Sequence, residues 1–144
     1  IYLYNIEENN DFKRSGMVNV NYAQQKFPPM VLSLYYMITA YSSSDIKFRA
    51  VQEQRMLGRI MQILADNSLI NGEMFGNDVM GADIRIELLD LTIEEKMKLW
   101  NDTTKPYKTS LCYKLTPVEL ESTKGRTISR VKEFTVELQD AAEE

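Results

Sequence analysis

The chain has 144 residues, 44% of them hydrophobic and 26% charged, which is the size and composition of one ordinary globular domain. Its net charge of −4 argues against nucleic acid or an anionic membrane as the main partner, and no apolar run approaches the roughly 20 residues that span a bilayer. Histidine is absent, which removes the commonest general base and metal ligand, and the single cysteine, Cys112, can form no internal disulfide, as in a reducing compartment.

The first predicted element is a strand over residues 1–8, where aromatic and β-branched side chains are frequent. The strand pattern is already present at Ile1, and the chain does not start with Met, so we expect this sequence to be a fragment of a longer one. Residues 9–26 are polar, and they predict a functional or mobile loop, or a loose hairpin around residues 17–22.

Residues 27–45, FPPMVLSLYYMITAYSSSD, predict a long central strand that starts after Pro28 and Pro29. Its even positions are predicted to form the core face. Its odd positions mix apolar and polar side chains, which predicts either a face covered by a helix of the same chain or a face that contacts another subunit. The even set is Met30, Leu32, Leu34, Tyr36, Ile38 and Ala40, and the odd set is Val31, Ser33, Tyr35, Met37, Thr39 and Tyr41.

Three serines and Asp45 offer N-cap side chains to a helix predicted over residues 46–65. Gly58 in the middle of this helix costs roughly 1 kcal/mol relative to alanine, so we predict that the helix packs closely on the sheet there. The predicted apolar face consists of Ala50, Leu57, Ile60, Met61 and Leu64.

The second half of the chain predicts shorter elements. Residues 71–83 contain three glycines and predict a loop, and residues 84–88 alternate as a half-buried strand does. Thr92 and Glu95 form a capping box, which predicts a short helix with Ile93, Met97 and Trp100 on its apolar face.

Two further strands are predicted, over residues 107–115 and residues 128–138. Pro117 is predicted to end the first or place it at an edge, and a hairpin turn is predicted at residues 123–125. This order predicts an α+β fold with a mostly antiparallel or mixed sheet and two helices packed on one face. We expect a single domain over residues 1–139 and a frayed tail over residues 140–144.

No set of residues predicts a catalytic, metal or cofactor site. Two catalytic carboxylates must face each other across a cleft, whereas Glu7-Glu8 and Glu94-Glu95 are adjacent in sequence. Cys112 lies in a predicted strand without a histidine to act as its base, and the glycines of residues 71–83 form no phosphate-binding pattern. We therefore predict no enzymatic activity, no cofactor and no small-molecule substrate.

Tyrosine and methionine number eight each, and both are enriched at protein interfaces. This composition favours a component of an assembly, which would use the odd face of the long strand and the loops at residues 9–26 and 71–83. The candidate subunit-interface residues are Val31, Tyr35, Met37, Tyr41, Met17, Tyr22, Met74 and Phe75.

Several segments resemble one protein family, in order over roughly residues 1–120. They are YLYNIEEN, PPMVLSLYYMITAYSSSD, EQRMLGRIMQILADN and IRIELLDLTIEEKMKLWNDTTKPYKTSLCYKLTPVEL. The residues that carry the resemblance are Pro28-Pro29, Glu53 to Arg59 as E-x-R-x-L-G-R, Leu88 to Glu95, Leu99-Trp100, Pro106-Tyr107, and Ser110 with Tyr113. The family is the cap or tube-terminator family of extracellular contractile injection systems, of the virulence-cassette and antifeeding-prophage type.

The resemblance implies a structural protein that is similar to phage tail terminators and has no catalytic residues. Its subunits would form a ring, usually hexameric, on the end of the inner tube and contractile sheath distal to the baseplate, and would stop polymerisation. The implied partners are the chain itself, the tube protein and the sheath protein. The implied location is the bacterial cytoplasm during assembly and then the released particle. The family also has a helix and a strand upstream of the segment that matches residue 1.

Two other functions stay open on the residues alone. A monomeric adaptor would bind a partner through the same tyrosine-rich face, and it predicts a monomer where a terminator predicts a discrete oligomer. An enzyme that uses carboxylates would need a concave site with at least two convergent acids of perturbed pKa.

Overall fold

The computed structural model describes residues 1–13, 15–21, 23–71, 83–100 and 104–127. The chain divides into two compact units, one of Ile1–Lys13 with Pro29–Leu120 and one of Arg14–Pro28 with Glu121–Glu144. The single domain predicted over residues 1–139 and the tail over residues 140–144 stay predictions. The elements are β1 (Tyr2–Glu8), the 3-10 helix η1 (Asn10–Phe12), β2 (Val18–Asn19), β3 (Gln24–Lys26), β4 (Met30–Thr39), α1 (Ile46–Asp66), β5 (Leu69–Ile70), β6 (Ile84–Leu88), α2 (Ile93–Leu99), β7 (Ser110–Leu120) and β8 (Gly125–Thr127).

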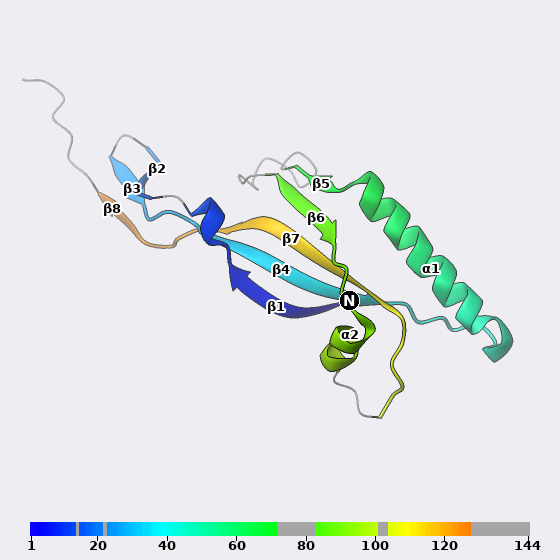
Figure 1. Ribbon diagram of the computed structural model, residues 1–144. Coiled ribbons are helices and arrows are strands. Elements are labelled where there is room, and N and C mark those ends of the chain that lie inside the picture. Colours follow the sequence, from blue (N-terminus) through cyan, green and yellow to red (C-terminus); the bar gives the residue numbers. More distant parts are fainter. Residues whose placement is uncertain (14, 22, 72–82, 101–103, 128–144) are drawn as a thin grey trace, which may run out of the picture. The chain divides into compact units, whose positions relative to one another are not determined.

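The first unit is built on a five-stranded sheet in the order β1-β4-β7-β6-β5, and every neighbouring pair in it is antiparallel (Figure 1). The long strand β4 lies inside this sheet between β1 and β7, as the sequence predicts for a central strand. With α1 and α2 in the same unit, the predicted α+β fold is confirmed.

In the second unit, the described residues form a three-stranded antiparallel sheet in the order β2-β3-β8. Val18 pairs with Lys26, so the hairpin predicted near residues 17–22 is confirmed. The hairpin turn predicted at residues 123–125 is wrong, because β8 pairs with β3 instead of returning along β7. The strand predicted over residues 128–138 lies outside the described residues, as does most of the loop predicted over residues 71–83.

The predicted core face of β4 is wrong. Val31, Ser33 and Met37 at odd positions are at most 4% exposed, whereas Ala40 is the one even position that is buried and Met30 is 48% exposed. Different segments lie at the two ends of this face: Asn9 donates to Ser33 Oγ at one end, and α2 lies near Met37 and Cys112 at the other. Lys96 of α2 is close enough to act electrostatically on Cys112, the β7 residue opposite Met37. The even face of β4 is therefore the more apolar in composition, but the odd face is the more buried in this chain.

The strand β7 runs through Pro117, which the sequence predicts to end it or place it at an edge. The ladder to β4 shifts between Leu32 and Leu34, where Thr116 and Pro117 face one residue, Ser33. A bulge leaves a residue out of the ladder, so proline, which lacks an N–H donor, is tolerated there. Asn9 closes the bulge, since its side-chain amide donates to Thr116 Oγ1 at 2.9 Å and to Ser33 Oγ at 3.2 Å.

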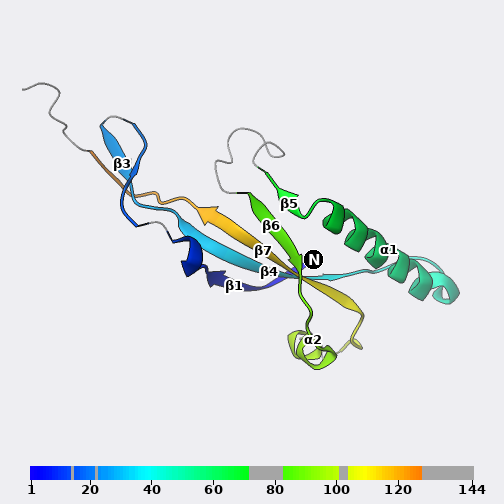
Figure 2. The same ribbon diagram turned by 45° about the horizontal axis from the view of Figure 1, so that its top comes forward.

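The helix α1 is confirmed, but its predicted packing is not. All 21 of its residues are described, and Leu57 is the buried one among them. A Cβ atom on Gly58 would meet nothing within 4 Å, so the prediction that Gly58 marks close packing on the sheet is wrong within this chain. Figures 1 and 2 both draw the first turns of α1 beyond the end of the strands, where the sheet offers no surface to cover them.

The short helix α2 begins as predicted, with the Thr92 and Glu95 capping box fully formed. Its apolar face differs from the prediction, because Ile93 and Met97 are exposed while Trp100 is half-buried. Among the described helices, none is both long and apolar enough to cross a membrane.

Candidate functional site

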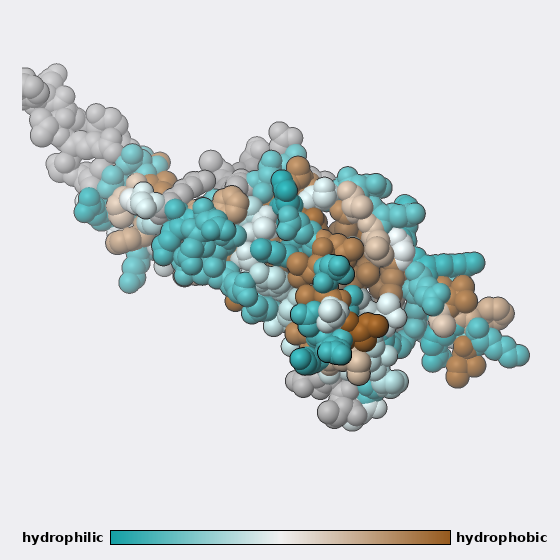
Figure 3. Space-filling model, in the orientation of Figure 1, coloured by the Kyte–Doolittle hydropathy of each residue, from teal (hydrophilic) through white to brown (hydrophobic). Residues whose placement is uncertain are grey.

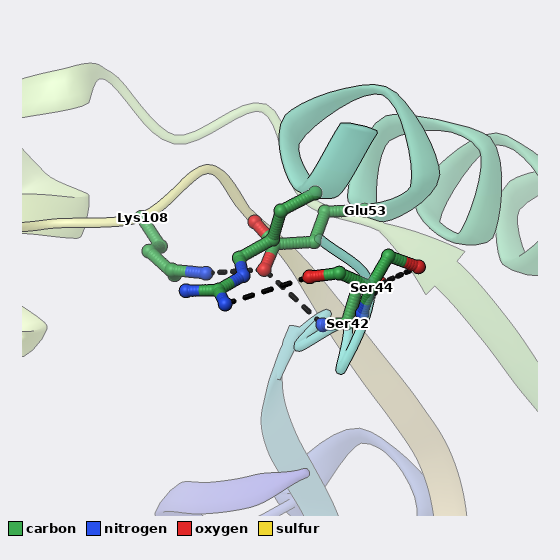
Figure 4. Close-up of polar contacts among 5 residues, drawn as sticks. Ser42, Ser44, Glu53 and Lys108 are labelled. Carbon is green, nitrogen blue, oxygen red and sulfur yellow. Dashed lines mark hydrogen bonds and ion pairs between the residues drawn. The ribbon is translucent and has the colours of Figure 1, made fainter. Parts of the chain in front are cut away.

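A polar anchor holds the start of α1 against the segment before β7 (Figure 4). Glu53, in the second turn of α1, accepts a hydrogen bond from Lys108 Nζ at 2.5 Å and another from the backbone N–H of Ser42 at 3.2 Å. The same ammonium lies 4.7 Å from the centre of the Tyr41 ring, a cation–π distance. These contacts tie together the end of β4, the turn after it and the start of β7, so they fix the direction in which α1 leaves the sheet.

The anchor depends on the charge of Glu53. The hydrogen bond from Lys108 and the backbone bond from Ser42 lower the pKa of the Glu53 carboxyl, so it is ionised at neutral pH. Arg49 adds a longer bond to the Ser44 carbonyl at 3.5 Å, and the Ser42 hydroxyl bonds Ser44. The serines therefore order the turn, whereas Asp45 at the N-cap position makes no side-chain capping bond.

The side of α1 that faces away from Leu57 carries a surface that we call the outer stripe. It consists of Lys47, Phe48, Val51, Arg55 and Arg59, and all five are exposed. These positions recur at helical spacing, so they share one side of α1. Figure 3 shows brown, hydrophobic side chains among teal ones on the part of α1 that extends past the strands. The stripe combines apolar area with positive charge and remains exposed among the described residues.

A second exposed surface follows β1, the edge strand opposite β5. We call it the edge surface, and it consists of Leu3, Ile6, Glu7 and Glu8. The register places Leu3 beside Tyr36 and Ile6 beside Leu34, so the two apolar side chains extend the partly exposed even face of β4. Among the described residues, no strand lies beside the outer side of β1, and such an edge can pair with a further chain segment.

Glu7 also fixes the side chain of Tyr35 on the other face of the sheet. The Tyr35 hydroxyl donates to Glu7 Oε2 at 2.7 Å, and Lys114 Nζ lies 5.8 Å from the centre of its ring. The hydrogen bond to Glu7, together with burial, raises the pKa of Tyr35 to about 12. Tyr35 is thus held by its own chain as a hydrogen-bond donor.

The candidate interface residues from the sequence lie in the first unit, in the second unit or outside the described residues. Tyr35, in the first unit, is partly exposed and bonded to Glu7. Val31 and Met37 are each 3% exposed within their own sheet, so they have almost no surface to offer another subunit, whereas Tyr41 is 57% exposed. Met17 belongs to the second unit and is partly exposed. Tyr22, Met74 and Phe75 lie outside the described residues. The interface as a whole stays a prediction, which Tyr41 fits and Val31 and Met37 do not.

Tyr41 borders a shallow cleft of about 260 Å³ at the end of the sheet. The cleft is lined by Ile1, Tyr2, Met37, Thr39, Tyr41, Leu99 and Trp100. The side chains that line it include no carboxylate, lysine, arginine or cysteine. Burial raises the pKa of the Cys112 thiol, which disfavours the nucleophilic thiolate. In the described part of the chain, no group of three acids or cysteines is placed to hold a metal ion.

Sequence reasoning missed both the anchor and the outer stripe. Glu53 and Lys108 are 55 residues apart, and no local pattern connects them. The outer stripe had a visible signal, since Phe48 and Val51 are large apolar residues that fall outside the predicted apolar face of the helix.

Comparisons with known proteins give a family match and a fold match. Residues 1–133 match the sequence profile of the family described as Pvc16 N-terminal domain. The fold is similar to a cryo-EM structure of an extracellular contractile injection system, the PVC sheath/tube terminator in its extended state, with a TM-score of 0.65 and 15% sequence identity. That similarity covers 97% of this chain and 49% of the other, so the chain spans about half the length of that terminator. No match was found among curated protein sequences.

Proposed function

Because the chain belongs to the Pvc16 N-terminal domain family, we propose that it is a structural subunit of a contractile injection system. Several copies form a ring, with six as the expected number, on the end of the inner tube and sheath distal to the baseplate. The ring stops further polymerisation and stabilises the particle. The protein acts without catalysis, in the bacterial cytoplasm during assembly and afterwards in the released particle.

The family match over residues 1–133 is the observation that carries this proposal. Two features of the chain support it. Large apolar side chains remain exposed on α1 and β1, as in a subunit that completes its burial in an assembly. The described clefts and acidic residues combine into nothing that resembles a catalytic site.

The direct test removes the protein that contains this chain from cells that produce the particles. We expect tubes and sheaths of irregular length, with ends that lack a cap, in electron micrographs. Restoring the protein restores uniform particles, and averaging of their distal ends reveals a ring. Uniform capped particles in its absence would contradict the proposal.

The mass of the purified protein separates the terminator from a monomeric adaptor. A terminator gives a ring-sized species, either free or on tube ends, because the contacts of a closed ring repeat around its axis. An adaptor stays a monomer and is absent from the ends of particles at every protein concentration.

A further inference from the structure

The two exposed surfaces of the first unit have opposite charge. The outer stripe of α1 carries three basic side chains and no acid, since the two acids of α1 are Glu53, which pairs with Lys108, and Asp66 at its last position. The edge surface carries Glu8, which lies 3.4 Å from Lys13, and Asp11 follows in η1. Glu7 adds a negative charge on the other face of β1, where it accepts from the Tyr35 hydroxyl. The chain as a whole has a net charge of −4, so the stripe is a local exception.

Gly58 lies beside the outer stripe, one turn after Arg55 and next to Arg59. Glycine destabilises the middle of a helix relative to alanine, and none of the described residues approaches closely enough to require it. A backbone or side chain from outside would explain it, since glycine permits the closest approach to a helix. The stripe therefore has an open glycine beside it as well as positive charge, and both suit a contact surface.

The edge surface carries acidic side chains, which the stripe does not. Leu3 and Ile6 extend a partly exposed apolar face, and Glu8, which its pairing with Leu32 places on the same face, supplies a carboxylate for the arginines of the stripe. Open edges of sheets are commonly protected by a helix that covers them. Neither of the described helices α1 and α2 runs along β1, and α1 leads from β4 into β5 at the opposite edge of the sheet (Figures 1 and 2).

We propose that the outer stripe of α1 in one subunit docks on the edge surface of β1 in the next copy of the chain. This inference rests on the proposed function, because it identifies the contact that repeats around the ring. Each surface repels a copy of itself by charge and attracts the other, so the contact is head-to-tail. The stripe lies on the helix that leads into β5, whereas the edge surface lies on β1 at the other edge of the sheet, so one copy can use both surfaces at once, as a closed ring requires.

Cysteine crosslinking between two co-expressed and differently tagged variants tests the contact. Val51→Cys marks the stripe and Ile6→Cys marks the edge surface, at side chains that are 47% and 55% exposed. The native Cys112 is fully buried and gives little background. The full protein is produced with its tube and sheath proteins, the particles are purified, and a short bismaleimide is added. Circular dichroism and thermal unfolding establish that each variant is folded.

We expect a crosslinked dimer that contains both tags, and little crosslinking when either variant is present alone. The matched control is Met56→Cys with Ile6→Cys. Met56 is 44% exposed and five residues further along, about 140° around the helix from Val51, and we expect at least tenfold less dimer from it. Because the tags differ, only contacts between copies are counted.

Other outcomes overturn the contact. Dimers from Val51→Cys alone would mean that α1 meets α1, and dimers from Ile6→Cys alone would mean that β1 meets β1. A crosslinked product of Val51→Cys with the tube or sheath protein would mean that the stripe binds that protein instead. Absence of any dimer in protein found on particle ends would reject the contact and leave the proposed function standing. Mixed-tag dimers in protein that is absent from particles would support the contact and reject the terminator function.

Discussion

Apolar residues are buried at the centre of the sheet but remain mostly exposed on the helix α1. Met37 and Cys112 face each other across β4 and β7, and both are almost completely buried. The helix α1 is three times as long as α2, with 21 residues against seven, and yet it buries Leu57 alone. Phe48, Val51 and Ile63 on α1 remain exposed.

The sheet centre therefore stabilises the fold of one chain, whereas α1 contributes little to that fold. The sheet centre is held by burial, whereas α1 is held at its root by the Glu53 anchor and by the cap at its other end, where Asn67 bonds the Ile63 carbonyl. A helix that buries so little contributes little to the stability of its own chain. Its exposed side is therefore available to another subunit.

The largest effect on stability is expected at the sheet centre. Met37→Ala should lower the free energy of unfolding by about 2–4 kcal/mol, because it leaves a cavity beside Cys112. The matched change on α1, Val51→Ala, should cost less than about 0.5 kcal/mol. Urea unfolding followed by circular dichroism measures both. Equal losses would mean that α1 packs within its own chain, which would remove the contrast between the two regions.

Asn9→Ala tests the polar part of the sheet, at the bulge of β7. Asn9 bonds Ser33 and Thr116, and its side chain also caps η1 by accepting from the Asp11 N–H at 3.1 Å. We expect a loss of about 1–2 kcal/mol in the free energy of unfolding. The exposed neighbour Asn10 is the control, and its alanine variant should unfold almost as the parent does. An unchanged midpoint for Asn9→Ala would show that the bulge holds without its amide.

Gly58→Ala should have opposite effects on the single chain and on the assembly. The new methyl group meets nothing in the chain, so the free energy of unfolding of the monomer should rise by roughly 0.5–1 kcal/mol. If a neighbouring copy approaches there, the same methyl group should reduce the ring-sized species in light scattering. A less stable monomer would contradict the open surface at Gly58.

The Glu53 anchor should make the start of α1 sensitive to acid. Its carboxyl has a lowered pKa in the folded chain, so the anchor is fully present above the ordinary glutamate pKa of about 4.3 and is lost as pH falls through the lower value. Hydrogen exchange of the first turns of α1 should therefore speed up on acidification, after correction for intrinsic rates. Glu53→Gln should remove most of this response, whereas the exposed Glu94→Gln should keep it.

Much of the first unit could be predicted from the sequence. The α+β class, the central position of β4 and the capping box of α2 follow from local patterns of apolar residues and cap side chains. The burial of β4 could not be predicted in this way. Both of its faces carry apolar side chains, and which one is buried depends on contacts between residues far apart in sequence, such as Asn9 with Ser33 and Thr116.

The candidate site was predicted less well, for a related reason. Val31 and Met37 have the composition of interface residues, but their own sheet buries them. Gly58 suggested close packing on the sheet, but a Cβ atom there would meet nothing within 4 Å, so the prediction is wrong within this chain. A single sequence gives the apolar character of a residue without saying whether the same chain or another one covers it.

The most direct test of the α1 contact is a charge exchange scored on assembled particles. Arg55→Glu should leave the monomer folded but reduce the share of particle ends that carry the ring by about tenfold, while Lys98→Glu on α2 should not. Combining Arg55→Glu with Glu8→Arg should restore the ring, since the two charges have been exchanged across one contact. Rings at full occupancy with Arg55→Glu alone, or no recovery in the folded double variant, would contradict the contact.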